Sequence, residues 1–417
     1  MKKSTKKKIG YFVAAFVTTV LIGTVGLLGY SVWNNGQEKS EDVLVLEEAP
    51  QEIVTDGESP EVMDAEIHDQ MPERAPEAAL EEEKQPAEVM PEEEPEEPGE
   101  VTLAFGGDIC FHDPFANMGA LVQRGGLIES CISDELLAEM RQADICMVNN
   151  EFPYSDGGTP IPEKTFTFRS KPENVNLLHE MGVDIVSLAN NHAYDHGESA
   201  LLDTFHILEQ AQIGYVGAGR NLSEASEPII REVNGVKVGI VAATQIERLD
   251  TPDTKGATEN APGVLRCFNE AELNHFLKVV EDAERQCDVL VVYIHWGTEN
   301  TDELDWAQPY QADLISKAGA DIIIGAHPHC LQGLGSVNGV PVVYSLGNYW
   351  FNSKALDTAL LKVVVGKEGV QSVQILPARQ QDCVTAMLHD GEKQRVLNYL
   401  QSLSPDVSLD ADGFMSW

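Results

Sequence analysis

The clearest shortage in this sequence is of positive charge. Its 417 residues include 28 Lys and Arg against 68 Asp and Glu, so the formal net charge is −40. Binding of nucleic acid requires Lys and Arg side chains clustered where they meet phosphates, and an acidic surface repels that polyanion. We therefore expect no nucleic acid among the partners of this protein.

Cysteine is also scarce and scattered. The chain has seven cysteines and no Cys-x-x-Cys pair, and the odd count does not suit a dense disulfide framework. We interpret these thiols as small buried apolar groups, with a single disulfide as the alternative.

What the sequence does contain near its start is one long apolar run. Residues 1–8 hold five lysines, and residues 9–33 hold no charged side chain. A helix of this length can cross a hydrocarbon core of ~30 Å, and the preceding lysines are expected to stay in the cytoplasm. We predict a single-pass cell-membrane anchor with the main domain outside the cytoplasm. The alternative is a cleaved signal peptide, whose apolar region is usually shorter, ~7–15 residues.

Residues 34–100 form an acidic segment rich in Glu and Pro, as in PEEEPEEPGE, with no apolar periodicity. Such a segment buries too little apolar surface to offset the entropy lost on ordering, so we predict a disordered linker. Its simplest role is to hold the outer domain away from the bilayer. A specific binding role for the acidic run is the alternative.

Residues 101–390 differ in character from this linker. Apolar runs such as VTLAF, DICMV, VKVGIVAA and DIIIGA alternate with amphipathic stretches that predict helices at 172–181, 198–210, 270–285 and 306–318. This alternation is typical of an α/β fold with buried sheets. Residues 391–417 are predicted to form a C-terminal helix and a polar tail.

Polar side chains stand directly after six of the predicted strands. They are Asp108, Glu151, Asn191 with His192, His295, His327 with His329, and Asn348. In open α/β sheets, the loops at the carboxyl ends of strands converge while the sheet holds them in place. Taken singly, each residue could serve in a turn, a helix cap or a solvated loop. Taken together, we interpret them as one site.

The donor set predicts a metal centre. Three histidines, two carboxylates and a carboxamide offer mixed nitrogen and oxygen ligands, which suit Zn²⁺, Mn²⁺ or Fe better than Ca²⁺. In the segment GAHPH, Pro328 restricts the backbone of the residue before it. We expect an extended turn there, from which His327 and His329 address neighbouring ions.

Six stretches of the sequence carry a resemblance to a known family. In chain order they are FGGDICF, NNEFP, GVDIVSLANNHAYDHG, IHWGTEN, GAHPHCLQG and YSLGNYWF. Together they resemble the CapA family of capsule (poly-γ-glutamate) synthesis proteins, within the calcineurin-like metallophosphoesterase superfamily. The resemblance implies two stacked mixed β-sheets flanked by helices, an αββα sandwich with divalent metals at the strand ends.

The resemblance also implies a role for each matching residue. The implied ligands are Asp108 and His329 for a first ion, Asn191, His295 and His327 for a second, and Glu151 between the two. His192 matches the histidine that acts near the leaving group. Asp195 would orient His192 or cap the helix that follows.

One position departs from the superfamily pattern. Where that pattern has Asp-x-His, this chain has Asp108-Ile109-Cys110, so the first ion lacks its usual histidine. Cys110 could replace it as a thiolate, although CapA-like proteins commonly lack this histidine too. We expect the first ion to be weakly bound, or absent from the resting protein.

Three functions stand as hypotheses. The first is a metal-dependent hydrolase or transferase acting outside the membrane on an anionic polymer such as poly-γ-glutamate, with Arg169 or Lys171 as local cations. The second keeps the fold but acts on phosphate esters. The third is a non-catalytic accessory subunit of a membrane polymer synthase or exporter, a role that suits a single anchor and a long tether.

Overall fold

The computed structural model describes residues 99–248 and 254–417 of the chain. The predicted segment 1–8, the anchor 9–33 and almost all of the linker 34–100 lie outside the described residues, and they stay predictions. Within the described ranges, no helix combines the length and the apolar character that a membrane crossing requires.

The first of two large sheets has eight strands, in the order β16-β15-β14-β1-β2-β3-β4, with β13 beside β1. They are β1 Val101–Ile109, β2 Ile145–Asn150, β3 Ile185–Ser187, β4 Gly214–Val216, β13 Asn348–Trp350, β14 Leu356–Gly366, β15 Gly369–Gln381 and β16 Val384–Met387. Strands β1 to β4 run parallel, and β14 to β16 extend the sheet through antiparallel pairs. The sheet is therefore mixed.

The second sheet has six strands, in the order β11-β12-β10-β9-β7-β6. They are β6 Ile229–Val233, β7 Val236–Thr244, β9 Val289–His295, β10 Ile322–Ala326, β11 Leu334–Val337 and β12 Val340–Val343. The four central strands, β7, β9, β10 and β12, are parallel. Strands β9 and β10 are buried along their whole length, which is why they read as continuous apolar runs in the sequence.

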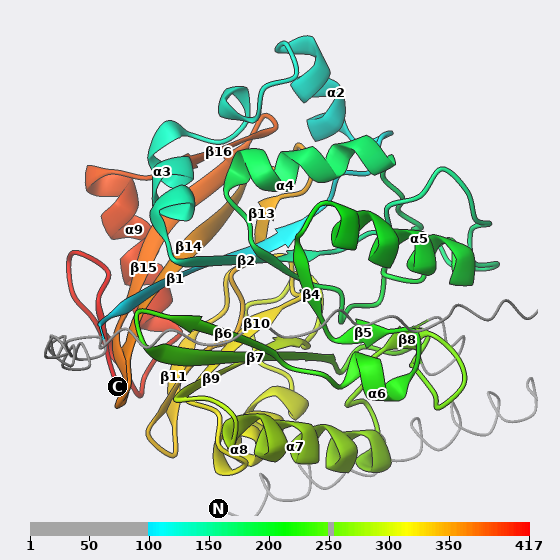
Figure 1. Ribbon diagram of the computed structural model, residues 1–417. Helices are drawn as coiled ribbons and strands as arrows, with labels where there is room; N and C mark the ends of the chain where they lie inside the picture. The colour runs from blue at the N-terminus through cyan, green and yellow to red at the C-terminus, as the bar shows by residue number, and fades with distance from the viewer. Residues whose placement is uncertain (1–98, 249–253) are drawn as a thin grey trace, which may run out of the picture. The chain divides into compact units, whose positions relative to one another are not determined.

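The two sheets stack face to face. The apolar layer between them includes Leu103 and Phe105 of β1 and Val291 and Tyr293 of β9. Helices cover the outer faces, as Figure 1 shows. On the first sheet these are α2 Ala116–Gln123, α3 Asp134–Gln142, α4 Asn176–Met181 and α5 Gly197–Gln210, and on the second α7 Glu270–Glu284 and α8 Ala307–Lys317. The predicted α/β class, with sheets flanked by helices, is confirmed.

The helices follow local sequence signals closely. Helices α5, α7 and α8 agree with the predicted ranges to within one residue. At the start of α7, Asn269 Oδ1 accepts the N–H of Glu272 at 3.1 Å, and Glu272 Oε2 accepts the N–H of Asn269 at 3.3 Å. This reciprocal capping satisfies two N–H groups that have no partner within the helix. The predicted helix 172–181 is divided into a 3₁₀ turn, η2 Pro172–Val175, and α4.

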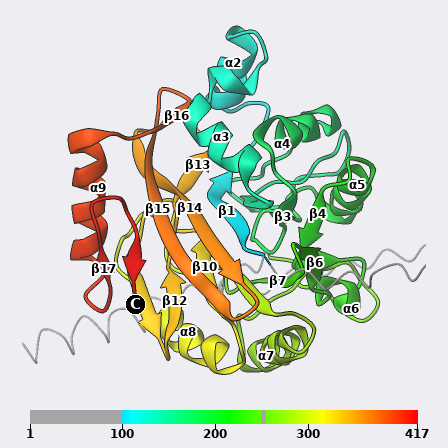
Figure 2. The same cartoon turned by 60° about the vertical axis from the view of Figure 1, so that its left-hand side comes forward.

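The C-terminal region belongs to the packed core. Helix α9, Asp390–Ser402, places Val396, Leu397 and Leu400 in the apolar layer between the sheets, and Figure 2 shows it beside β15. The tail then forms a short antiparallel pair that the sequence did not predict. The remaining short elements are η1 Ile128–Ser130, β5 Ala218–Gly219, α6 Leu222–Ala225, β8 Gly263–Val264, β17 Ser408–Leu409 and β18 Met415–Ser416.

All seven cysteines lie in the described part of the chain, and all are free thiols. Five of them are buried, and Cys287 and Cys330 are partly exposed. Their interpretation as small apolar groups is confirmed for the five, and the alternative of a disulfide is not supported.

Because α9 fills part of the core, we expect Leu397→Ala to lower the free energy of unfolding by about 2–5 kcal/mol, the cost of deleting a buried leucine side chain. Urea unfolding followed by circular dichroism measures the change. Asn398→Ala, on the exposed face of the same helix, is the matched control, and its effect should stay within about 0.5 kcal/mol. Equal effects of the two changes would mean that α9 is not part of the cooperative core.

Candidate metal centre

The carboxyl ends of strands from both sheets meet at one place. The first sheet supplies Asp108 near the end of β1, Glu151 after β2 and Asn191 after β3, and the second supplies His295 at the end of β9 and His327 and His329 after β10. Close to this place, the Tyr293 hydroxyl of β9 donates a hydrogen bond to the Gly106 carbonyl of β1 at 3.1 Å. The fold thus brings all six predicted metal ligands together.

A close backbone contact positions the carboxylate of β1. A Cβ atom at Gly107 would lie 1.9 Å from the carbonyl oxygen of Gly347, so only glycine fits there. The N–H of Asp108 donates to that same oxygen at 3.0 Å. Asp108 is paired in register with Asn348 of β13, whose Oδ1 lies 2.8 Å from His329 Nδ1. The glycines therefore bring the ends of β1 and β13 together at the site.

Asn149, in the last part of β2, is the hub of the hydrogen bonds that hold the carboxylates. Its fully buried side-chain amide donates to Asp108 Oδ1 at 2.7 Å and to Glu151 Oε2 at 3.3 Å. The Asn190 amide donates in turn to Asn149 Oδ1 at 3.0 Å. Such contacts fix the orientation of groups that bind a metal. The pattern of polar residues after strands does not single out Asn149, because it lies inside a strand.

The imidazoles of the second sheet face the ligands of the first. His295 Nε2 lies 2.9 Å from Asn191 Oδ1 and 3.1 Å from His327 Nδ1. His329 Nδ1 lies 3.4 Å from Asp108 Oδ2. Nitrogen and oxygen atoms of the types that bind Zn²⁺, Mn²⁺ or Fe thus converge from opposite sides.

One carboxylate oxygen in the middle of this group has no hydrogen-bond partner. Glu151 Oε1 is buried. The imidazole Nε2 atoms near it, at 3.8–3.9 Å, belong to His192, His295 and His329. A buried anionic oxygen without a partner costs free energy that a bound cation would offset. The residues present therefore fit a divalent metal ion beside Glu151.

Two sets of donor atoms in the described residues could each hold an ion, with all atoms of a set within 4.8 Å of one another. The sets are Glu151 with His327 and His329, and Asp108 with Glu151 and His295. Their division of the histidines differs from the one that the resemblance implies. Glu151 belongs to both sets, as expected of a carboxylate between two ions.

Burial and neighbouring charges set the protonation of these groups. Burial raises the pKa of Glu151 well above its usual value. Burial, together with the neighbouring imidazoles, lowers the pKa of His295 and His327 well below theirs, which leaves neutral rings able to bind a metal. Burial alone would also lower the pKa of His329, but the Glu151 and Asp108 carboxylates raise it to about 9. A positive charge beside the Glu151 and Asp108 carboxylates is therefore favourable, and a bound metal ion would supply it.

The backbone of the His-Pro-His segment differs from the expected extended turn. His327 has a φ of 98° and His329 a φ of 58°, so both lie in the positive-φ region. The prediction of an extended turn before Pro328 is therefore wrong. The strained segment is held by two hydrogen bonds, from the N–H of His327 to Asp108 Oδ2 at 3.3 Å and from the N–H of Asn300 to the Pro328 carbonyl at 2.8 Å. Strain of about 1–3 kcal/mol per residue is typical of functional sites.

A buried ion pair holds the segment that carries Asn191 and His192. His192 Nδ1 lies 2.7 Å from Asp195 Oδ2, and Asp195 Oδ1 lies 2.8 Å from Lys164 Nζ. Lys164 also donates to the Asn191 carbonyl. The Lys164 side chain is 5% exposed and that of Asp195 is fully buried. Asp195 thus orients His192, which stacks on Phe168 with ring centroids 4.2 Å apart.

Cys110 belongs to neither set of donor atoms. It lies in the apolar layer between the first sheet and its helices, together with Phe111. Burial raises the pKa of the Cys110 thiol well above its usual value. Because the thiolate is the form that binds metals, a thiol held neutral in this way is a poor ligand. The structure gives no support to a thiolate in place of the missing histidine.

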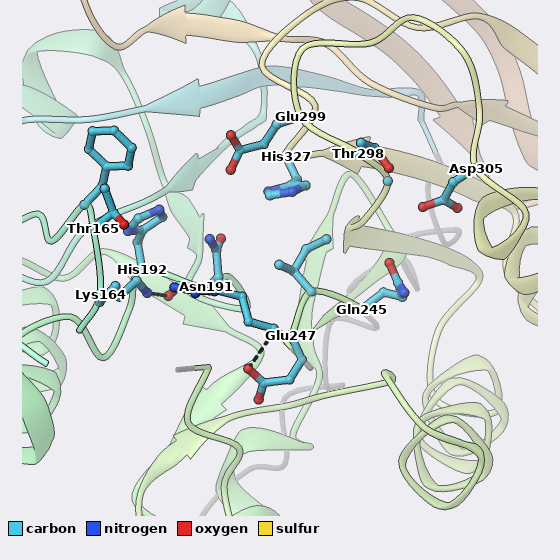
Figure 3. Close-up of a pocket in the computed structure, with 14 residues that line it drawn as sticks. Lys164, Thr165, Asn191, His192, Gln245, Glu247, Thr298, Glu299, Asp305 and His327 are labelled. Atoms are coloured by element: carbon cyan, nitrogen blue, oxygen red, sulfur yellow. Dashed lines mark hydrogen bonds between the residues drawn. The ribbon is translucent and has the colours of Figure 1, made fainter. Parts of the chain in front are cut away.

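A cavity of ≈ 530 Å³ opens beside the centre (Figure 3). Asn191, His192 and His327 form part of its wall. Arg169 and Lys171, the two local cations suggested by the sequence, do not line it. Arg169 instead donates to the Gly157 carbonyl at 2.6 Å.

The fold and these residues define a class, an α/β protein with a candidate metal centre at the strand ends of two stacked sheets. Within it, the chain belongs to the family described as bacterial capsule synthesis protein PGA_cap, which matches residues 102–353. The family membership predicted from the sequence motifs is thereby confirmed.

Three relatives illustrate the family. The chain is 32% identical over 242 residues to the "PGA biosynthesis protein CapA" of Bacillus subtilis, covering 56% of this chain and 61% of that protein. It is 30% identical over 223 residues to the "Capsule biosynthesis protein CapA" of Bacillus anthracis, covering 53% of each. It is 27% identical over 217 residues to a "Probable polyglutamine synthesis accessory protein" of Mycobacterium tuberculosis, covering 50% and 56%. The matches span little more than half of each relative.

We expect Glu151→Gln to remove most of the stabilisation by metal. Addition of Mn²⁺ or Zn²⁺ to wild-type protein from which a chelator has removed metal should raise its melting temperature. An ion that binds only the folded state stabilises that state by about 2.7 kcal/mol at a hundredfold excess over Kd. The variant should show little of this rise, since it lacks the carboxylate shared by both donor sets. Differential scanning calorimetry makes the comparison.

Glu281→Gln, on the exposed surface of α7, is the control for this experiment and should respond to metal like the wild type. A full metal-dependent rise in Glu151→Gln would show that the ion binds elsewhere.

Proposed function

We propose that this chain is a membrane-anchored, extracytoplasmic protein of capsule or poly-γ-glutamate biosynthesis, and that its metal centre catalyses hydrolysis or transfer at an amide bond of the polymer. The observation that carries the proposal is the unpartnered oxygen of Glu151, surrounded by three imidazoles. Membership of the PGA_cap family and the names of the Bacillus relatives support the polymer. The apolar run at 9–33 supports the anchor.

The proposed centre has the metallophosphoesterase-like arrangement. Two ions would be held by Asp108, Asn191, His295, His327 and His329, with Glu151 between them. Divalent ions held by these residues would supply a Lewis acid for the attacked carbonyl and would lower the pKa of a water molecule. Asn149 holds the two carboxylates in place for that purpose.

His192 would handle the proton of the leaving group. Its Nδ1 contacts Asp195, so its Nε2 is free to exchange a proton at the site. In amide hydrolysis, the oxygen of water bonds to the carbonyl carbon and the carbon–nitrogen bond breaks. One proton of the water would pass to His192 Nε2 and from there to the departing nitrogen. The carboxylic acid that forms would give its proton to the amine, so the products are a carboxylate and an ammonium. In transfer, an acceptor amine replaces the water.

A second function, that of a non-catalytic accessory subunit of a polymer synthase or exporter, is favoured by a separate observation. Cys110 stands where the superfamily has a histidine and lies in an apolar layer, so the Asp108 side of the centre has one protein ligand fewer. The name of the mycobacterial relative, which includes the words "accessory protein", also favours this function.

Under the proposed catalytic function, His192→Ala should lower kcat on poly-γ-glutamate by about 10²–10⁴-fold, the usual contribution of a general acid or base. The measurement is the appearance of new amino groups with purified protein and Mn²⁺. The metal content, measured by mass spectrometry, should stay unchanged, because His192 belongs to neither donor set. His206→Ala, exposed on α5, is the control.

The accessory function predicts a different outcome. If cells that carry His192→Ala or Asp108→Ala produce normal amounts of polymer of normal length, catalysis at this site is not needed. The accessory function would then be supported if the membrane synthase or exporter subunits copurify with one another in wild-type cells and no longer do so in cells that lack this chain.

A further inference from the structure

The cavity beside the candidate metal centre is lined partly by residues that are not candidate metal ligands. Besides ligands of the centre, it is lined by Gln245 after β7, by Glu299 in the loop after β9 and by Asp305 before α8. His192, which is 6% exposed, also lines the cavity, and its Nε2 lies 3.8 Å from Glu151 Oε1. A cavity whose wall combines this imidazole with carboxylate and carboxamide side chains suits a ligand with polar groups.

The cations near this cavity are already engaged. Lys164 forms the buried ion pair with Asp195 and donates to the Asn191 carbonyl. Arg248 also has interaction partners. A polyanion would therefore find no uncommitted lysine or arginine among the described residues that line the cavity. The lining of the cavity therefore does not offset the repulsion between a polyanion and this acidic chain.

The charged side chains of the cavity lining that a ligand could contact are carboxylates. Glu299 is exposed and, within the described ranges, has no hydrogen bond or ion pair. Figure 3 shows its side chain close to His327, so it lies beside the centre. Asp305 Oδ1 accepts the N–H groups of Ala307 and Gln308, which holds this second carboxylate in place.

This arrangement matches a ligand with one anionic or carbonyl end and one cationic end. The metal centre takes oxygen atoms, and a carboxylate at the edge of the same cavity attracts a primary ammonium. Interior units of poly-γ-glutamate carry carboxylates and amide nitrogens, and neither is a cation. Only the amino-terminal unit of the chain carries an α-ammonium.

We propose that Glu299 binds the α-ammonium of the amino-terminal unit of a poly-γ-glutamate chain, so that the cavity receives a chain end and not an interior segment. This inference rests on the proposed function, because the polymer is the one proposed there. It assigns to Glu299 a role in selecting the ligand. Catalysis stays with the centre and His192.

The test compares two probes on the full chain in detergent with Mn²⁺, tri-γ-glutamate with a free amino group and the same peptide acetylated at that nitrogen. Isothermal titration calorimetry should show the free peptide binding about two- to fivefold more tightly, the range for one exposed charge pair. Glu299→Gln should weaken the free peptide by a similar factor and leave the acetylated one unchanged. The preference should also shrink as salt is raised.

Glu303→Gln is the matched control, because this exposed carboxylate lies on the same loop and does not line the cavity. It should keep the full preference for the free peptide. Equal binding of the two peptides by the wild type, or binding of neither, would overturn the inference, as would an unchanged preference in Glu299→Gln.

The same probes separate this inference from the proposed function. A preference for the free peptide without any turnover would support chain-end binding and count against catalysis. Cleavage of acetylated and free polymer at equal rates would support catalysis and overturn chain-end selection. If added simple amines compete with the free peptide and are joined to the polymer, the ammonium site serves an acceptor and the assignment to the chain end is wrong.

Discussion

Glu151 Oε1 is a buried carboxylate oxygen that no N–H or O–H group reaches. Its second oxygen is held by the amide of Asn149, which also holds Asp108. The desolvation of such a group is costly unless a positive charge is close. The three imidazoles around it and the high pKa of His329 reflect that requirement. The Asn149 amide holds Glu151 itself, whereas the N–H of His327 and the contact of Gly107 with Gly347 position Asp108 beside it.

The segment after β3 is held by a buried ion pair between Lys164 and Asp195. Lys164 neutralises Asp195 and fixes the Asn191 carbonyl, and Asp195 orients His192. The candidate ligand Asn191 and the proposed proton-transfer residue His192 are therefore held by the same ion pair. Because both members of the ion pair are buried, removal of either would leave a charge without compensation and disturb metal binding and proton transfer together. Lys164 therefore contributes both to the stability of this segment and to the geometry of the site.

Much of this architecture can be predicted from the sequence, for identifiable reasons. Helices such as α7 are fixed by local caps and periodicity, and polar residues such as His295 stand out because they end apolar strands. Other features depend on distant partners. Asn149 lies inside a strand, Lys164 is one charged loop residue among many, and the positive φ of His327 opposes the preference of a residue before proline. Likewise, Leu397 packs into an apolar cluster whose members come from both sheets.

The ligands of the candidate centre come from both sheets, and contacting residues such as Asp108 and His327 are 219 positions apart in the chain. No short stretch of the unfolded polypeptide can assemble them, so the site exists only after the two sheets have packed. Since affinities for divalent ions follow one general order at most protein sites, the ion that is bound depends strongly on which ions are available at that moment. The composition of the medium in which the chain completes its folding would then decide which metal the protein carries.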